Sequence, residues 1–151
     1  MEEEIKRAKR KALQILTRMD RSEYELKNSL QRSKFSEEAV FSAIEYVKSY
    51  GYLDDFRYAC QYIRIHGVGK GKIRLKFELS NKGLEDEIIE NAFLEVEEFD
   101  EREGITTLLK KKWGKEEKPE QKELNKLVSY LLRRGYQSSD IWSVLRQENL
   151  T

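Results

Sequence analysis

The sequence predicts an all-α protein built as an elongated tandem array of three three-helix repeats. The main observation is an apolar pattern that occurs three times, each time with internal spacings of four, five, five and four residues. Its copies start 49 and then 52 residues apart and consist of Leu26, Leu30, Phe35, Val40 and Ile44, then Leu75, Leu79, Leu84, Ile89 and Phe93, then Leu127, Leu131, Tyr136, Ile141 and Leu145. A repeat of about 50 residues is typical of helical arrays, which usually present binding surfaces.

Two further observations favour helices throughout the chain. Pro119 is the only proline, so the long periodic segments contain no residue that breaks a helix. No segment alternates apolar and polar residues as a strand does, and there is no Asn-Gly or Asp-Gly hairpin signal.

The first repeat is predicted to span residues 1–53. Apolar residues at helical spacing over residues 5–19 predict its first helix. Ser22, with a glutamate three residues later, has the spacing of a capping box and starts the second helix. Ser36 is followed by two glutamates, which favour the positive end of a helix dipole, and starts the third. Gly51 suits a helix C-terminus because glycine enters the left-handed conformation without steric cost.

The second repeat is predicted to span residues 54–98. Two aspartates at its start are expected to cap a helix over residues 54–65. After a glycine-rich interruption, further helices are expected over residues 72–81 and 85–97, and Gly83 ends the first of these.

The third repeat is predicted to span residues 99–151. Its first helix covers residues 100–113, and a polar linker follows. Pro119 suits the first turn of a helix that ends near Arg134. Two serines and an aspartate then open the last helix, over residues 138–149.

One turn position connects the three repeats. The residue before the third member of the apolar pattern is Lys34, Gly83 and Gly135 in the three copies. Two glycines predict a left-handed backbone here, and a lysine would adopt it at a cost of about 1 kcal/mol. We therefore predict that Lys34→Gly is neutral or stabilising.

Composition excludes several function classes. Cys60 and His66 are the only cysteine and histidine, so no internal disulfide and no common zinc site can form, and little remains for nucleophilic catalysis. We expect Cys60 to be a buried thiol and predict no catalytic site, metal or cofactor. No apolar stretch approaches the roughly 20 residues that cross a bilayer, and no signal-peptide core is present. A soluble cytoplasmic protein is the simplest interpretation.

Charge is balanced overall but uneven along the chain. The formal net charge is +1, yet residues 57–84 contain seven bases against Glu78 alone, and residues 85–103 contain ten acids against Arg102. A further basic stretch, interrupted by acids, covers residues 110–122, and another covers residues 6–11. Such blocks are often solvated helix faces, but a basic face also attracts phosphates or an acidic protein surface.

Two local patterns do not match known ligand sites. The Gly-Val-Gly-Lys-Gly-Lys segment at residues 67–72 lacks the spacing and the preceding strand of a phosphate-binding loop. The acid-rich residues 85–103 match no calcium-loop spacing and are expected to be a solvated helix face.

Four segments together resemble the RecX family, the regulatory proteins of the bacterial RecA recombinase. They are ALQILTRMDRSEYEL at residues 12–26, YGYLDDFRYA at 50–59, GKGKIRLKFELSNKGL at 69–84, and YLLRRGY at 130–136 with Ile141 and Leu145 after it. The resemblance covers nearly the whole chain in the family's order. It implies tandem three-helix repeats, and it implies a protein that binds RecA, lies in the groove of the RecA–DNA filament and inhibits its ATPase, strand-exchange and co-protease activities. The balanced charge departs from the more basic family pattern.

The sequence thus leads to a non-enzymatic, monomeric modulator of RecA in recombination, DNA repair and the SOS response. Contacts with RecA or with DNA phosphates are predicted for Arg57, Arg64, Lys70, Lys72, Arg74, Lys76, Arg133 and Arg134. The alternative is a helical-repeat module that binds nucleic acid independently of RecA, and weak direct DNA binding is compatible with both. An enzyme is disfavoured because no constellation of base, nucleophile or metal ligands is present.

Overall fold

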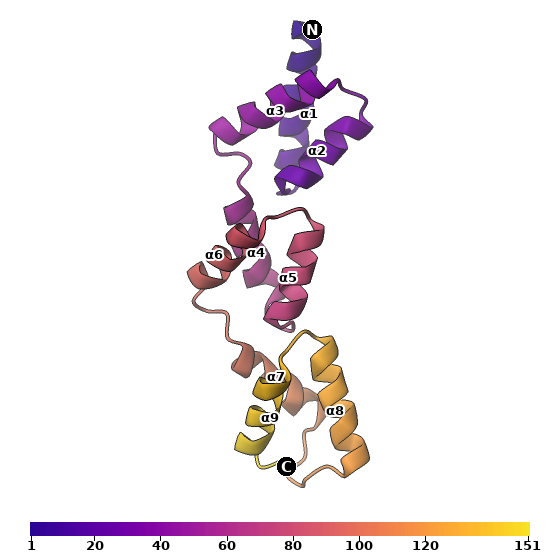
Figure 1. The fold of residues 1–151 in the computed structure, drawn as a ribbon, viewed down its shortest axis with the longest axis vertical. Helices are drawn as coiled ribbons and strands as arrows, with labels where there is room; N and C mark the ends of the chain where they lie inside the picture. The colour runs from indigo at the N-terminus through magenta and orange to yellow at the C-terminus, as the bar shows by residue number, and fades with distance from the viewer. The chain divides into compact units, whose positions relative to one another are not determined.

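The computed structural model describes residues 1–151 and contains nine helices and no strand, which confirms the all-α prediction (Figure 1). The helices are α1 (Glu2–Arg18), α2 (Glu23–Arg32), α3 (Glu37–Ser49), α4 (Asp55–His66), α5 (Lys72–Asn81), α6 (Asp86–Glu95), α7 (Glu101–Lys112), α8 (Gln121–Arg133) and α9 (Ser138–Gln147). None of them combines the length and the apolar character that a membrane crossing requires.

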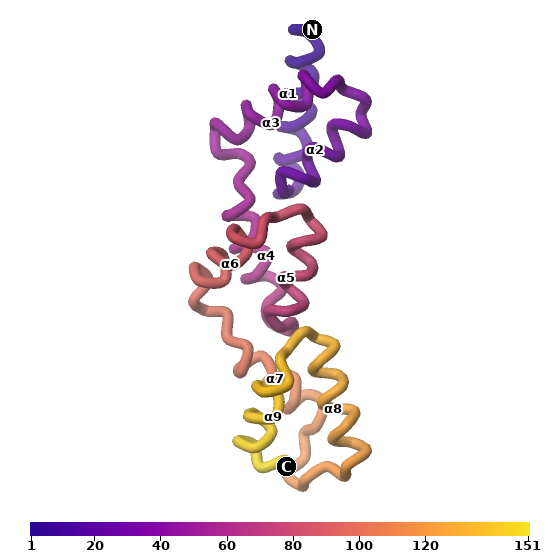
Figure 2. The backbone as a smooth tube through the Cα atoms, viewed as in Figure 1, coloured from indigo at the N-terminus to yellow at the C-terminus, as the bar shows by residue number.

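The chain divides into two compact units. One comprises Met1–Gln61 with Leu79–Ala92, and the other comprises Tyr62–Glu78 with Phe93–Thr151, so the division runs through α4, α5 and α6. In the first unit α3 packs mainly against α1, and in the second α9 packs against α7 (Figure 2). In each case the third helix of a repeat therefore returns to the first.

Local signals in the first repeat produce the predicted helix ends. The Ser22 hydroxyl accepts a hydrogen bond from the Glu25 amide at 3.2 Å, and the Glu25 carboxylate accepts one from the Ser22 amide at 3.1 Å. The Ser36 hydroxyl accepts a hydrogen bond from the Ala39 amide at 3.2 Å. These contacts satisfy amides that the first helical turn leaves without backbone partners, and they confirm both predicted starts.

The shared turn position has the predicted conformation in all three repeats. The φ angles are 66° at Lys34, 81° at Gly83 and 95° at Gly135. Steric crowding adds a reason for glycine at two of these positions, since a Cβ on Gly83 would meet the Tyr24 ring and one on Gly135 would lie 2.6 Å from the Arg74 amide nitrogen. Lys34 is exposed and bears only the backbone cost.

The apolar pattern forms the core. Thirteen of its fifteen residues are buried, and the remaining two, Phe35 and Phe93, are partly buried. Cys60 is buried, as predicted. The pattern therefore belongs to the scaffold, and functional residues are to be sought on the polar faces around it.

One predicted helix start is wrong. Pro119 does not lie in the first turn of its helix, because α8 begins at Gln121 and Glu120 is its N-cap. The Glu120 amide donates to the Glu123 carboxylate at 3.4 Å. Glu120, bonded to Glu123, is therefore the residue that caps α8, and the helix does not start at the proline. Pro119 restricts the backbone conformation just before the helix.

Candidate functional site

Four of the eight predicted contact residues meet where the loop before α5 touches the turn after α8, namely Lys70, Arg74, Arg133 and Arg134. The Gly71 amide donates to the Arg134 carbonyl at 2.8 Å, and the Arg134 guanidinium donates through Nε to the Gly69 carbonyl at 2.7 Å. Arg74 donates to the Arg133 carbonyl at 3.2 Å. Arg74 and Arg134 thus donate to backbone carbonyls, so they help to build this junction.

Glu78 forms ion pairs with two of these bases. Its carboxylate accepts hydrogen bonds from Lys70 Nζ at 3.0 Å, Arg74 Nε at 3.0 Å and the Tyr62 hydroxyl at 2.6 Å. Burial alone would raise the pKa of Glu78, but the bonds from Tyr62, Lys70 and Arg74 outweigh it and lower that pKa to about 2. The carboxylate is therefore ionised at neutral pH and offsets one of the two positive charges of Lys70 and Arg74.

The other four predicted residues are not gathered at one place. Arg57 donates to the carbonyls of Gly51 at 2.7 Å and Tyr52 at 3.1 Å. Arg64 pairs with Glu98 at 2.6 Å on an exposed surface. The remaining two lie on α5 and are half-buried, namely Lys72 and Lys76.

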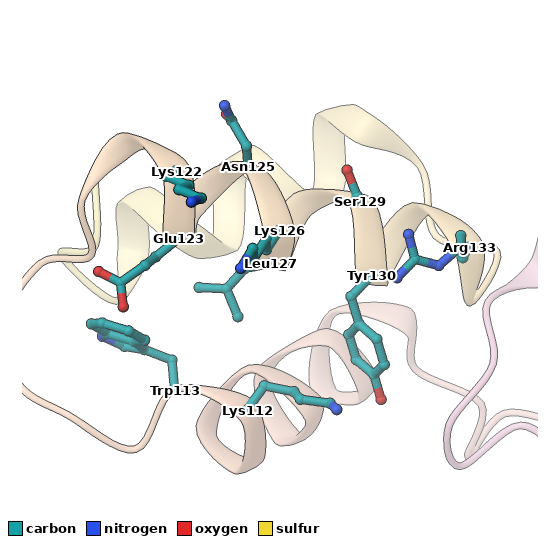
Figure 3. A pocket seen from close by; sticks show the side chains of 10 residues that line it. All are labelled: Lys112, Trp113, Lys122, Glu123, Asn125, Lys126, Leu127, Ser129, Tyr130 and Arg133. Carbon is teal, nitrogen blue, oxygen red and sulfur yellow. The ribbon is translucent and has the colours of Figure 1, made fainter.

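A concave surface with a volume of about 800 Å³ lies between α7 and α8 in the second unit (Figure 3). We call it the α7–α8 groove. Trp113 and Tyr130 stand at opposite ends of it, with Leu127 between them (Figure 3). Its lining includes four bases, namely Lys112, Lys122, Lys126 and Arg133.

The bases of the α7–α8 groove lack acidic partners. None of the four forms a salt bridge, and the one acid in the lining, Glu123, lies at the α8 capping box. Lys112 Nζ lies 4.6 Å from the centre of the Tyr130 ring, and Lys115 Nζ lies 4.7 Å from the centre of the Trp113 ring. Cation–π contacts of this kind restrain lysines without neutralising them. The groove thus presents positive charge beside aromatic surface.

Of the groove residues, only Arg133 was among the predicted contacts. Two of the others can be identified from the repeat itself, when the second and third copies are aligned at their offset of 52 residues. At that offset Lys122 corresponds to Lys70 and Lys126 to Arg74. Tyr130, however, occupies the position of Glu78. The basic pair is thus present in both repeats, whereas the carboxylate that pairs with it is present only in the second.

Comparison with known proteins identifies the repeats. Three sequence models match the chain in order: the first three-helix domain of RecX at residues 8–46, the second at residues 54–92 and the third at residues 100–145.

Relatives match along most of the chain. The regulatory protein RecX of Vibrio vulnificus (strain CMCP6) is 38% identical over 138 residues, which cover 91% of this chain and 90% of that protein. The regulatory protein RecX of Clostridium acetobutylicum is 33% identical over 145 residues, covering 93% and 68%. The crystal structure of RecX from Lactobacillus salivarius has the same fold, with a TM-score of 0.86 over the whole of both chains at 23% identity.

Proposed function

Because the chain belongs to the RecX family of regulatory proteins, we propose that it regulates the RecA recombinase. It binds RecA and lies in the groove of the RecA filament on DNA. Its main effect is to inhibit ATP hydrolysis, strand exchange and co-protease activity in recombination and DNA repair. The observation that carries the proposal is the match of three RecX domains, in order, within one chain.

Several finer statements belong to the same proposal. The protein acts in the cytoplasm as a monomer, and its repeats divide at residues 53/54 and 98/99. Exposed bases supply contacts to the filament, and Arg57, Arg64, Arg74 and Arg133 are the exposed members of the predicted set. Arg64 suits a test because its guanidinium is on the surface and its acidic partner is known.

The test is ATP hydrolysis by RecA filaments on single-stranded DNA, measured as the protein is added. We expect hydrolysis to fall as the protein saturates the filament. Binding to the filament is followed in parallel by sedimentation. If the protein sediments with the filament and hydrolysis is unchanged, the proposal of inhibition is wrong.

A matched pair of variants tests the predicted contact. Arg64→Ala and Glu98→Ala both break the Arg64–Glu98 ion pair, but only the first removes the cation. We expect weaker inhibition with Arg64→Ala and unchanged or stronger inhibition with Glu98→Ala. Equal effects of the two variants would assign Arg64 a structural role and remove it from the contact set.

A further inference from the structure

We propose that the α7–α8 groove binds single-stranded nucleic acid, with its bases on the phosphates and its aromatic rings against the nucleobases. The proposal concerns this chain alone and does not rest on an interaction with RecA. The proposed binding site for the nucleic-acid strand is in the third repeat and not in the glycine-rich loop of the second.

The comparison of two equivalent basic pairs carries the proposal. In the second repeat, Lys70 and Arg74 share the carboxylate of Glu78, with N–O distances of 3.0 Å. In the third repeat, Lys122 and Lys126 have no such partner, because Tyr130 stands where the carboxylate would be. A ligand that binds the second pair must displace an internal ion pair, whereas the third pair is available to an anion directly.

The arrangement of bases along α8 suits a linear anion. Lys122, Lys126 and Arg133 lie on one helix, and the eleven residue steps from the first to the last correspond to about 16 Å at the usual rise per residue. Phosphates in a stacked strand follow one another at about 3.4 Å, so this row faces about four or five of them. Lys112 adds a fourth base from α7, on the opposite side of the groove.

The aromatic residues favour a nucleic acid over other anions. Trp113 is held in place by a hydrogen bond from its Nε1 to the Glu117 carbonyl at 3.0 Å. Leu127 contributes an apolar floor between this indole and the Tyr130 ring (Figure 3). Unpaired bases beside aromatic rings are the combination by which proteins hold single strands, since every nucleobase has a face that can stack. An acidic peptide would compensate the bases but leave the rings unused.

The first measurement is binding of a fluorescent oligothymidylate of about 15 nucleotides to the full chain as salt increases. Four phosphate contacts predict a log–log slope of about −2.8, so affinity falls about 50-fold between about 50 and 200 mM salt. Lys122→Ala with Lys126→Ala leaves two contacts and reduces the slope to about −1.4, or about 7-fold over that range. Arg10→Ala with Lys11→Ala removes the same charge from exposed positions on α1 and should leave the slope unchanged.

The second measurement tests the comparison between repeats. Tyr130→Glu rebuilds the arrangement of the second repeat and should abolish the binding that depends on Lys126. Tyr130→Phe keeps the ring and should bind as the unmodified chain does. Gln14→Glu makes the same charge change on α1 and is the matched control. Because Tyr130 is half-buried, helix content and thermal unfolding are compared first, and the exposed-lysine variants decide the outcome if Tyr130→Glu does not fold.

A direct signal comes from the indole in the groove. In a Trp142→Phe background, Trp113 is the only tryptophan, and stacking of a base should quench its emission. Quenching by oligothymidylate or by oligouridylate supports the site and shows whether DNA or RNA is preferred. Three outcomes would overturn it: no binding at about 50 mM salt, binding without quenching, or quenching by a polyglutamate peptide as strong as that by the oligonucleotides.

Discussion

A buried hydroxyl in the third repeat permits a prediction with a defined sign. Tyr136 is only 1% exposed, and its hydroxyl has no hydrogen-bond partner within the protein. Burial raises the pKa of this phenol to about 12, so it is neutral at physiological pH. Gly104 lies beside it in α7, where an added Cβ would be 2.6 Å from the hydroxyl oxygen but 3.4 Å or more from the ring carbons. The hydroxyl alone therefore excludes a side chain at position 104.

The perturbation is a double-mutant cycle between Gly104→Ala and Tyr136→Phe. Alanine in a helix interior is favoured over glycine by about 1 kcal/mol, but the overlap with the hydroxyl costs about 1–3 kcal/mol. Gly104→Ala alone should therefore be neutral or destabilising by up to about 2 kcal/mol. Tyr136→Phe removes an unpartnered hydroxyl and should be neutral or stabilising. In the double variant the overlap is absent, so the alanine should stabilise the helix without that cost. The coupling free energy between the two changes should then be favourable by about 1–3 kcal/mol.

The assay is urea unfolding followed by tryptophan fluorescence. Trp113 and Trp142 are the only tryptophans, and both pack against the core of the third repeat, so their emission reports on that repeat. If the two changes are additive within about 0.5 kcal/mol, the close approach of Gly104 to the Tyr136 hydroxyl is wrong.

Two further predictions concern the shared turn and the Glu78 cluster. In thermal unfolding followed by circular dichroism, Lys34→Gly should be neutral or stabilising by up to about 1 kcal/mol. Gly135→Ala should destabilise the protein, because φ at this position is 95° and Arg74 occupies the space that the added Cβ would need. A clear loss of thermal stability with Lys34→Gly would count against the repeat alignment. The folded pKa of Glu78 lies near 2, below its usual 4.5, so its stabilising contribution is present above pH 4.5 and is lost as the pH falls toward 2. Unfolding measured across this pH range should show a smaller acid loss for Glu78→Gln, and equal losses would contradict the low pKa.

Much of the fold could be predicted from local sequence because its determinants are local. The capping box at Ser22, the left-handed turn at Lys34 and the buried apolar pattern each depend on spacings of a few residues. The start of α8 could not be predicted in the same way. A glutamate is an uncommon N-cap, and the hydrogen bonds that make Glu120 one become visible only in the structure.

The roles of the bases were harder to predict because pairing depends on partners that are distant in sequence. Arg64 pairs with Glu98, 34 residues away, and Arg134 bonds to the Gly69 carbonyl, 65 residues away. Counting charges in a window marks residues 57–84 as strongly basic, yet their single acid, Glu78, contacts two of the seven bases at once. Charge density along a sequence therefore overestimates the charge available at that surface.

The same comparison explains how repeats with one scaffold can differ in function. Positions 78 and 130 each precede a buried leucine of the apolar pattern, Leu79 and Leu131. A carboxylate at the first position forms ion pairs with both bases beside it, whereas a phenol ring at the second leaves the equivalent bases unpaired and adds aromatic surface. The buried neighbours are leucines in both repeats, so this difference in electrostatics requires no change in the core. A net charge of +1 is therefore compatible with a site for a polyanion. The affinity of such a site depends on whether its own bases are paired with acids, and not on the net charge of the whole chain.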